Sequence, residues 1–467
     1  MQDTADVTRR LWALCGVLRN DGITYHEYLN ELTYLLFLKL AKELDMEKAI
    51  PRELGWKKLS STPQAKQLEF YRESLRLLSK THNEIVREIF SGAKTAINSP
   101  ASLNQLVQAI DDIDWYRARQ NGIGDVYEGL IEKNAQESRY GAGQYFTPRP
   151  VVEAIVQACR PTPRDSVYDP AAGTGGFLIA AGLHARDKDG KTPSLTGVEL
   201  VNDVRTLGLM NLMLHDLQGD VALGDALHQP PNKKGFSLCL TNPPFGMKGS
   251  LTKEQNELLD FPTANKQLAF LQHSYKNLAP NGRAAIVVPD NVLFEGGIAT
   301  SIREKLVHDF RLHTVLRLPT GIFYATGVRT SVLFFCADGG TTKTWFYDLR
   351  EGQASFGKRR QFTSKDLQDF VNCYGPDAMG RSERTITDRF RPMSLSDLAA
   401  NNYRLDVVTH KSDADRTSAV TIERMLESTR SMTDELGSVQ SNIREIEKLL
   451  TAFAESPDAF DYTQGNS

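Results

Sequence analysis

Phe236-Ser-Leu-Cys-Leu-Thr-Asn-Pro-Pro-Phe245 joins a short apolar run to an Asn-Pro-Pro-aromatic tetrapeptide. The run is typical of a buried strand. Pro243 fixes its own φ at about −65°, and each proline favours an extended residue before it, so the backbone carbonyls here point in fixed directions. Asn242 adds a side-chain carbonyl and Phe245 a flat apolar face. Acceptors beside an aromatic ring suit an N–H₂ group on a planar system, such as a nucleobase taken out of its stack or an amide. Taken alone, the tetrapeptide fits a proline-rich loop equally well.

The composition is that of an ordinary globular protein. The 467 residues predict two to four domains, and 40% hydrophobic and 24% charged residues provide an ample core. A net charge of −3 excludes a uniformly basic nucleic-acid coat. The five cysteines are scattered and form no Cys-x-x-Cys pair, which supports neither a disulfide framework nor a metal site. No signal peptide or membrane-spanning segment is evident, so we expect a cytoplasmic protein.

Residues 164–340 alternate between strand and helix patterns. This alternation predicts an α/β fold, a doubly wound and mostly parallel Rossmann-like sheet with helices on both faces. Ligands of such sheets bind beyond the carboxyl ends of the strands. The predicted strands are 167–172, 195–200, 221–227, 236–241, 283–289, 314–318 and 330–335, with 330–335 closing the sheet.

The first 135 residues read as helical throughout. Leu29, Leu32, Leu36 and Leu40 follow three- and four-residue spacings, which indicates an amphipathic helix. Further helical patterns cover 66–78, 83–90 and 103–110. The expected role of this region is packing without chemistry.

Three strand ends carry side chains suited to a nucleotide-like ligand. Asp169-Pro-Ala-Ala-Gly-Thr-Gly-Gly176 is a glycine-rich turn that lets the backbone approach a ligand and precedes a helix N-terminus. Glu199 ends the second strand, where a carboxylate typically binds the hydroxyls of a ribose. Asp225, behind Gly224, ends the third strand and can accept from an adenine amino group. A dinucleotide site would also fit such a turn, although the spacing is not Gly-x-Gly-x-x-Gly and no phosphate loop is present.

Together these motifs resemble the gamma-class amino-methyltransferases of DNA. The resemblance rests on their order: Gln144-Tyr-Phe-Thr-Pro148, Asp169 to Phe177, Gly197-Val-Glu199, Gly224-Asp225 and Asn242-Pro-Pro-Phe245. Over nearly its whole length the chain resembles, more closely, the modification subunit of a Type I restriction-modification system. Leu35-Leu-Phe-Leu-Lys-Leu40 and Asn402-Tyr-Arg-Leu405 also match that subunit's layout. One departure is glycine at position 176, where relatives also use alanine.

The resemblance implies an S-adenosylmethionine-dependent methyltransferase acting on the N6 amino group of adenine, in a sequence chosen by a separate specificity subunit. Asn242, Pro243, Pro244 and Phe245 would hold the target base, with Phe245 stacking on it. The implied cofactor-binding residues are Gln144, Tyr145, Phe146, Thr147, Pro148, Arg149, Asp169, Gly173, Thr174, Gly175, Gly176, Glu199 and Asp225. No metal is required.

The C-terminal region carries a seam of apolar residues. From Ile422 to Phe453, spacings of three and four alternate over more than four heptads, interrupted only by Thr429. The seam predicts a coiled-coil helix that docks on the specificity subunit, although packing back on its own domain would also bury it. The implied partners are that subunit, a second copy of this chain, double-stranded DNA and an ATP-dependent restriction subunit.

We therefore expect four parts: a helical N-terminal domain (1–135), the methyltransferase domain (136–340), a loop-rich extension (341–410) and a helical docking tail (411–467). Methylation of a glutamine amide in a protein, methylation of cytosine N4 and a non-enzymatic scaffold remain open as alternatives. The glutamine reading fits less well because phenylalanine stands at position 245, where tyrosine is usual.

Overall fold

The computed structural model describes residues 4–14, 25–46, 49–115, 123–137, 146–228, 235–245, 251–323, 328–350, 356 and 362–406. All of these residues belong to one compact unit that spans Met1–Val407. The expected docking tail, 411–467, and two of the expected cofactor residues, Gln144 and Tyr145, lie outside the described residues.

The N-terminal part of the chain is helical, as predicted. The stripe expected from the leucine spacing lies on α3 (Tyr25–Glu43). It is buried at Leu32, Leu36 and Leu40, but Leu35 and Phe37 between them are equally buried. This helix is therefore enclosed on most sides, and it packs against α4 (Trp56–Ser61), α7 (Pro100–Asp111), α9 (Ile123–Glu137) and α12 (Asn202–Leu214). The helices of this region are α1 (Thr4–Ala13), α3 (Tyr25–Glu43), α4 (Trp56–Ser61), α5 (Gln64–Leu78), α6 (Glu84–Ile89), α7 (Pro100–Asp111) and α9 (Ile123–Glu137).

A nine-stranded sheet forms the centre of the rest of the chain, in the order β3-β2-β1-β4-β5-β7-β6-β8-β9. The five strands from β3 to β5 run parallel, while β7 pairs antiparallel with both β5 and β6. The strands are β1 (Ser166–Asp169), β2 (Ser194–Glu199), β3 (Gly219–Leu223), β4 (Phe236–Thr241), β5 (Leu278–Pro289), β6 (Arg311–Leu318), β7 (Thr330–Cys336), β8 (Lys343–Asp348) and β9 (Phe390–Ser394).

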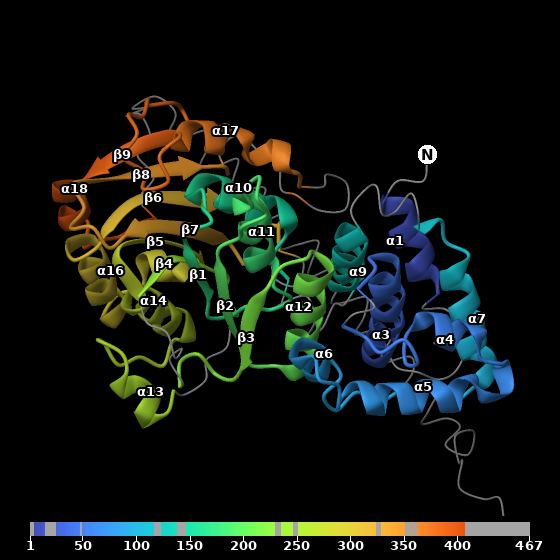
Figure 1. Cartoon of the computed structure of the whole chain (residues 1–467). Coiled ribbons are helices and arrows are strands. Elements are labelled where there is room, and N and C mark those ends of the chain that lie inside the picture. Colours follow the sequence, from blue (N-terminus) through green and yellow to red (C-terminus); the bar gives the residue numbers. More distant parts are fainter. Residues whose placement is uncertain are drawn as a thin grey trace, which may run out of the picture. The chain divides into compact units, whose positions relative to one another are not determined.

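Helices cover both faces of this sheet (Figure 1). The two faces can be followed along β5, where Ala285 and Val287 join one buried cluster and Ala284 and Ile286 join the other. Because successive side chains of a strand point to opposite faces, a strand with no polar alternation must be covered twice. The helices of this part of the chain are α10 (Arg149–Cys159), α11 (Gly176–Ala185), α12 (Asn202–Leu214), α13 (Lys253–Glu257), α14 (Lys266–Lys276), α15 (Asn291–Phe294), α16 (Ile298–His308), α17 (Ser364–Tyr374) and α18 (Leu395–Ala400). The doubly wound fold predicted from the sequence is thus the observed one.

The expectation that 330–335 closes the sheet was wrong. Strand β8 pairs in parallel with β6, and β9 pairs antiparallel with β8, so part of the expected loop-rich extension belongs to the sheet. Four consecutive residues of β8, 344–347, are buried. Trp345 and Tyr347 both pack near Phe390 of β9, with ring centroids 4.7 and 6.0 Å away. A short aromatic strand between charged loops gives a weak pattern, which is why the sequence did not reveal it.

A buried ion pair fixes the amino ends of the central strands. Arg283 on β5 donates to both carboxylate oxygens of Asp165, at 2.9 and 3.0 Å. Ser237 on β4 donates to the same carboxylate at 2.6 Å and accepts from the backbone N–H of Ser166. Because β1, β2, β3 and β4 pair in parallel, their carboxyl ends lie at a common edge. In the described part of the chain, no helix combines the length and the apolar character needed to cross a membrane.

Candidate functional site

A cavity of about 140 Å³ lies at the carboxyl ends of β1 to β4. Four carboxylates line it, against a single lysine, Lys266. This balance favours a positively charged ligand. Ten of the predicted site residues line the cavity: Phe146, Thr147, Asp169, Gly173, Thr174, Gly176, Glu199, Asp225, Asn242 and Pro244. Five others do not: Pro148, Arg149, Gly175, Pro243 and Phe245.

The glycine-rich turn after β1 is built by close backbone approach. Gly175 precedes α11 with φ +82°, a left-handed conformation that glycine adopts without strain. On the neighbouring helix α12, a Cβ at Gly208 would lie 3.1 Å from the Gly173 carbonyl oxygen. The backbone N–H of Gly173 donates to the Glu199 carboxylate at 2.9 Å. The turn is therefore fixed to both β2 and α12, while a Cβ at Gly176 would meet open space.

Two carboxylates at the strand ends are held in fixed orientations. Glu199 accepts from the backbone N–H groups of Gly173 and Val201, both at 2.9 Å. Asp225 accepts from the Gln255 side chain at 2.8 Å and from the backbone N–H of Leu227 at 3.0 Å. Each anion keeps lone pairs for a ligand, because a carboxylate offers about four acceptor positions.

Burial disfavours the charged forms of these acids. It raises the pKa of Asp169, which is 1% exposed, to about 7, although the backbone N–H of Ala171 donates to its carboxylate. Burial also raises the pKa of Glu199, against the hydrogen bonds from Val201 and Gly173. A cation in the cavity would stabilise both carboxylates.

Asn242 presents a buried acceptor to the cavity. Its amide Nδ2 donates to Thr147 Oγ1 at 2.9 Å, which joins the end of β4 to the segment before α10. Its Oδ1 is buried and accepts no hydrogen bond within the described residues. Leaving a buried acceptor unpaired costs about 1–3 kcal/mol, so a ligand that donates a hydrogen bond to Oδ1 would remove that cost.

Of the three residues after Asn242, Pro244 lines the cavity, whereas Pro243 and Phe245 do not. The Pro244 carbonyl accepts from Gln267 Nε2 at 2.9 Å and is therefore already engaged. Phe245 is partly exposed and meets Phe323 edge to face, with ring centroids 5.5 Å apart. One edge of the Phe245 ring is thus supported by the protein.

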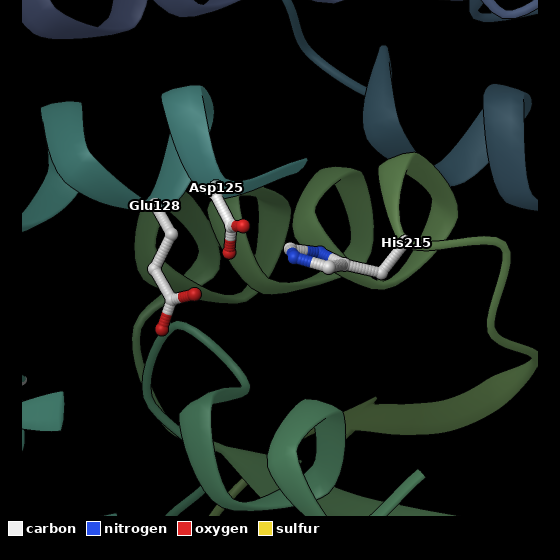
Figure 2. A group of neighbouring side chains, drawn as sticks. All are labelled: Asp125, Glu128 and His215. Atoms are coloured by element: carbon white, nitrogen blue, oxygen red, sulfur yellow. The ribbon is translucent and has the colours of Figure 1, made fainter. Parts of the chain in front are cut away.

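Arg149, which we expected at the cofactor, instead pairs with three acids. Its guanidinium lies 2.9 Å from Asp125 and 3.6 Å from Glu128 on α9, and 3.0 Å from Glu153 on α10. His215, at the end of α12, lies close to Asp125 and Glu128 (Figure 2). One ring nitrogen of His215 and one carboxylate oxygen from each of the two acids all lie within 4.8 Å of one another. The cluster contains its own cation, Arg149, and links α9 to α10.

Sequence reasoning missed one acid of the cavity. Glu128 lies on α9, in the region to which we assigned packing alone, and it lines the cavity with Phe146 and Thr147. The available signal was the pair Asp125 and Glu128, which are three residues apart and so share a helix face. Lys266 and Phe270, at the start of α14, also line the cavity and carried no recognisable motif.

Comparison with known proteins places this geometry in a family. Residues 118–418 match the family described as N-6 DNA Methylase. The Type I restriction enzyme EcoKI methylase subunit of Escherichia coli (strain K12) is 43% identical over 414 residues, which cover 81% of this chain and 78% of the relative. The StySPI methylase subunit of Salmonella potsdam shows the same identity and coverage.

Solved structures give the same picture. The crystal structure of the EcoKI M protein matches with a TM-score of 0.53 and 36% identity, over 92% of this chain and 94% of that one. A chain from a study of complex assembly and conformational transition of the type I R-M system matches with a TM-score of 0.70 and 26% identity, over 96% and 98%.

These matches define the class first: the protein is an adenine-specific DNA methyltransferase. Within that class, the chain belongs to the family of Type I restriction enzyme methylase subunits. The family decides against the glutamine, cytosine and scaffold alternatives.

Proposed function

We propose that the cavity binds S-adenosylmethionine and that Asn242 holds the amino group of the target adenine of DNA beside it. The observation that carries the proposal is the buried, unpaired Oδ1 of Asn242 in the same cavity as Glu199 and Asp225. The residues present fit the cofactor, since the acidic lining suits a sulfonium cation and the open space at Gly176 leaves room for a ligand against the turn. When bound, the cofactor supplies an electrophilic methyl group.

Each part of the cofactor has a candidate partner in this chain. Glu199 binds the ribose hydroxyls, and its orientation is set by the two backbone N–H groups that it already accepts from. Asp225 accepts from the amino group of the cofactor's own adenine, and Gln255 holds the Asp225 carboxylate in place. Phe146, Thr147 and the turn from Asp169 to Gly176 enclose the remainder. We extend this role to Gln144 and Tyr145 on the family motif, and we assign Arg149 and Pro148 to positioning the segment.

Two acceptors make the target nitrogen reactive. The N6 lone pair of adenine is delocalised into the ring, so the nitrogen is a poor nucleophile. Asn242 Oδ1 and the Pro243 carbonyl would accept one hydrogen bond each from the two N–H groups of this amino nitrogen. These hydrogen bonds would draw the nitrogen towards tetrahedral geometry and localise its lone pair. Placing that nitrogen in line with the methyl group then accounts for most of the catalysis.

The base reaches this position by leaving the DNA stack. Flipping costs a few kcal/mol, and stacking on an aromatic ring returns about 1–3 kcal/mol. Phe245 provides the ring, with Phe323 supporting its edge.

Assembly supplies the sequence specificity. We propose that the seam in residues 411–467 docks on a specificity subunit, with a second copy of this chain and an ATP-dependent restriction subunit in the full enzyme, on double-stranded DNA in a prokaryotic cytoplasm. A related solved structure comes from a study of complex assembly of the type I R-M system, which supports assembly of this kind. Deleting residues 420–467 should abolish co-elution with the specificity subunit while S-adenosylhomocysteine still binds. Co-elution of the truncated chain would contradict the docking role.

The test of the function is reconstitution with the specificity subunit that accompanies this chain in its source. DNA incubated with methyl-labelled S-adenosylmethionine and then digested to nucleosides should contain label in N6-methyladenine. Label in N4-methylcytosine, or none in DNA while S-adenosylhomocysteine binds, would reject the proposal.

A further inference from the structure

Glu128 differs from the other acids of the cavity in where it comes from. It is the one lining residue, among those described, that the N-terminal helical region contributes. Its side chain is 15% exposed, so it faces the cavity without being open to bulk water. Figure 2 shows Glu128 and Asp125 projecting from the same side of α9. The packing region therefore places one carboxylate in the cavity.

Glu128 is also the acid with the least satisfied carboxylate. Asp169, Glu199 and Asp225 each accept at least one hydrogen bond from the protein. Among the described residues, Glu128 accepts none, and its ion pair with Arg149 is long, at 3.6 Å. A buried carboxylate without hydrogen bonds is costly unless a ligand cation completes it.

We propose that Glu128 binds the α-ammonium group of the methionyl arm of S-adenosylmethionine. The inference rests on the proposed function, in which Asp225 and Glu199 take the adenine and the ribose. The cofactor then has one further charged part, the methionyl arm with its ammonium group. Glu128 lies near the segment that contains Thr147, because Arg149, two residues after Thr147, pairs with Glu128.

The protonation state of Glu128 gives this role a pH dependence. Burial raises the pKa of its carboxyl to about 7, even though Arg149 opposes the shift. The titratable and charged groups that face it are Arg149, Asp125, Glu132, Glu153 and His215, and burial lowers the pKa of His215. A carboxyl must be ionised to bind an ammonium group. The contribution of the methionyl arm to affinity should therefore increase as the pH rises through about 7.

Calorimetry with three ligands tests the proposal on the full chain. S-adenosylhomocysteine carries the whole arm, its decarboxylated analogue S-adenosyl-3-thiopropylamine keeps only the ammonium, and 5′-methylthioadenosine lacks both charges. Glu128→Gln should weaken the first two by about 10- to 100-fold, the usual cost of losing a charged hydrogen bond. It should leave 5′-methylthioadenosine within about twofold, which also shows that the variant is folded.

Asp125→Asn is the matched control. Asp125 lies on the same helix and pairs with Arg149 at 2.9 Å, but it does not line the cavity. This variant should keep the wild-type ratio between S-adenosylhomocysteine and 5′-methylthioadenosine. Equal weakening of all three ligands by Glu128→Gln would mean that Glu128 only positions α9, and unchanged binding of the amine would exclude an ammonium contact. If the wild-type chain binds none of the ligands, the proposed function itself fails.

Discussion

Replacing Asn242 with alanine should separate methyl transfer from cofactor binding. The substitution removes the buried Oδ1 that we assign to the target amino group, together with the hydrogen bond from Nδ2 to Thr147. It touches none of the hydrogen bonds that hold Glu199 and Asp225. The cofactor part of the cavity should therefore survive.

The expected loss in transfer is large. Removing one preorganised hydrogen-bonding group from a catalytic site costs about 2.7–4 kcal/mol, or about 10²–10³ in rate. The same change should alter S-adenosylhomocysteine affinity by less than about twofold. Single-turnover methylation by the reconstituted complex gives the first quantity, and calorimetry on the same preparation gives the second.

Thr147→Val provides the control for positioning. It removes the hydroxyl that accepts from Asn242 Nδ2 but leaves Oδ1 in place, so transfer should fall by about 10-fold, less than in the alanine variant. Undiminished transfer in Asn242→Ala, or a loss of S-adenosylhomocysteine binding that matches the loss of transfer, would refute the assignment.

Three further substitutions test other parts of the argument. Phe245→Ala should weaken productive DNA binding by about 1–3 kcal/mol, measured as a higher KM for DNA, and an unchanged KM would remove the stacking role. Gly208→Ala places a Cβ 3.1 Å from the Gly173 carbonyl and should lower S-adenosylhomocysteine affinity about tenfold, whereas equal affinity would mean that the turn yields freely. Asp165→Asn leaves Arg283 buried without its anion and should lower the melting temperature at pH 7. Burial alone would raise the pKa of Asp165, but Arg283, Ser237 and the Thr162 backbone lower it to about 2. The stabilisation is therefore complete above the unfolded value of 3.8 and is lost as the pH falls through about 2, so the difference from wild type should shrink over that window.

The parallel half of the sheet could be predicted because β4 and the last part of β5 are nearly continuous apolar runs, and because motifs follow β1, β2, β3 and β4. The predicted strand 236–241 coincides with β4, and the apolar run 283–289 forms the last part of β5. The far edge could not be predicted in the same way. Strand β8 begins at Lys343 and ends at Asp348, and it is defined as a strand by its pairing with β6 and β9 rather than by its own pattern.

Arg149 illustrates what a motif cannot reveal. Its position after Thr147-Pro148 indicated the cofactor, and nothing in the sequence showed that Asp125, Glu128 and Glu153 would meet its guanidinium. The position of Glu128 depends on how α9 packs against α10 and α12, which is long-range information. Asn242 was easier to assign, because the backbone around it is fixed locally by prolines.

The cluster around Arg149 gives the helical region a part in the reaction. Arg149 begins α10, directly after Thr147-Pro148, and Thr147 accepts from Asn242 at the end of β4. The same arginine pairs with Asp125 on α9, and Arg205 on α12 pairs with Glu88 on α6. A shift of the helices would therefore move both Glu128, at one wall of the cavity, and the segment that holds Asn242. Substitutions that displace these helices should therefore alter cofactor affinity and transfer together, whereas a change confined to Asn242 should alter transfer alone.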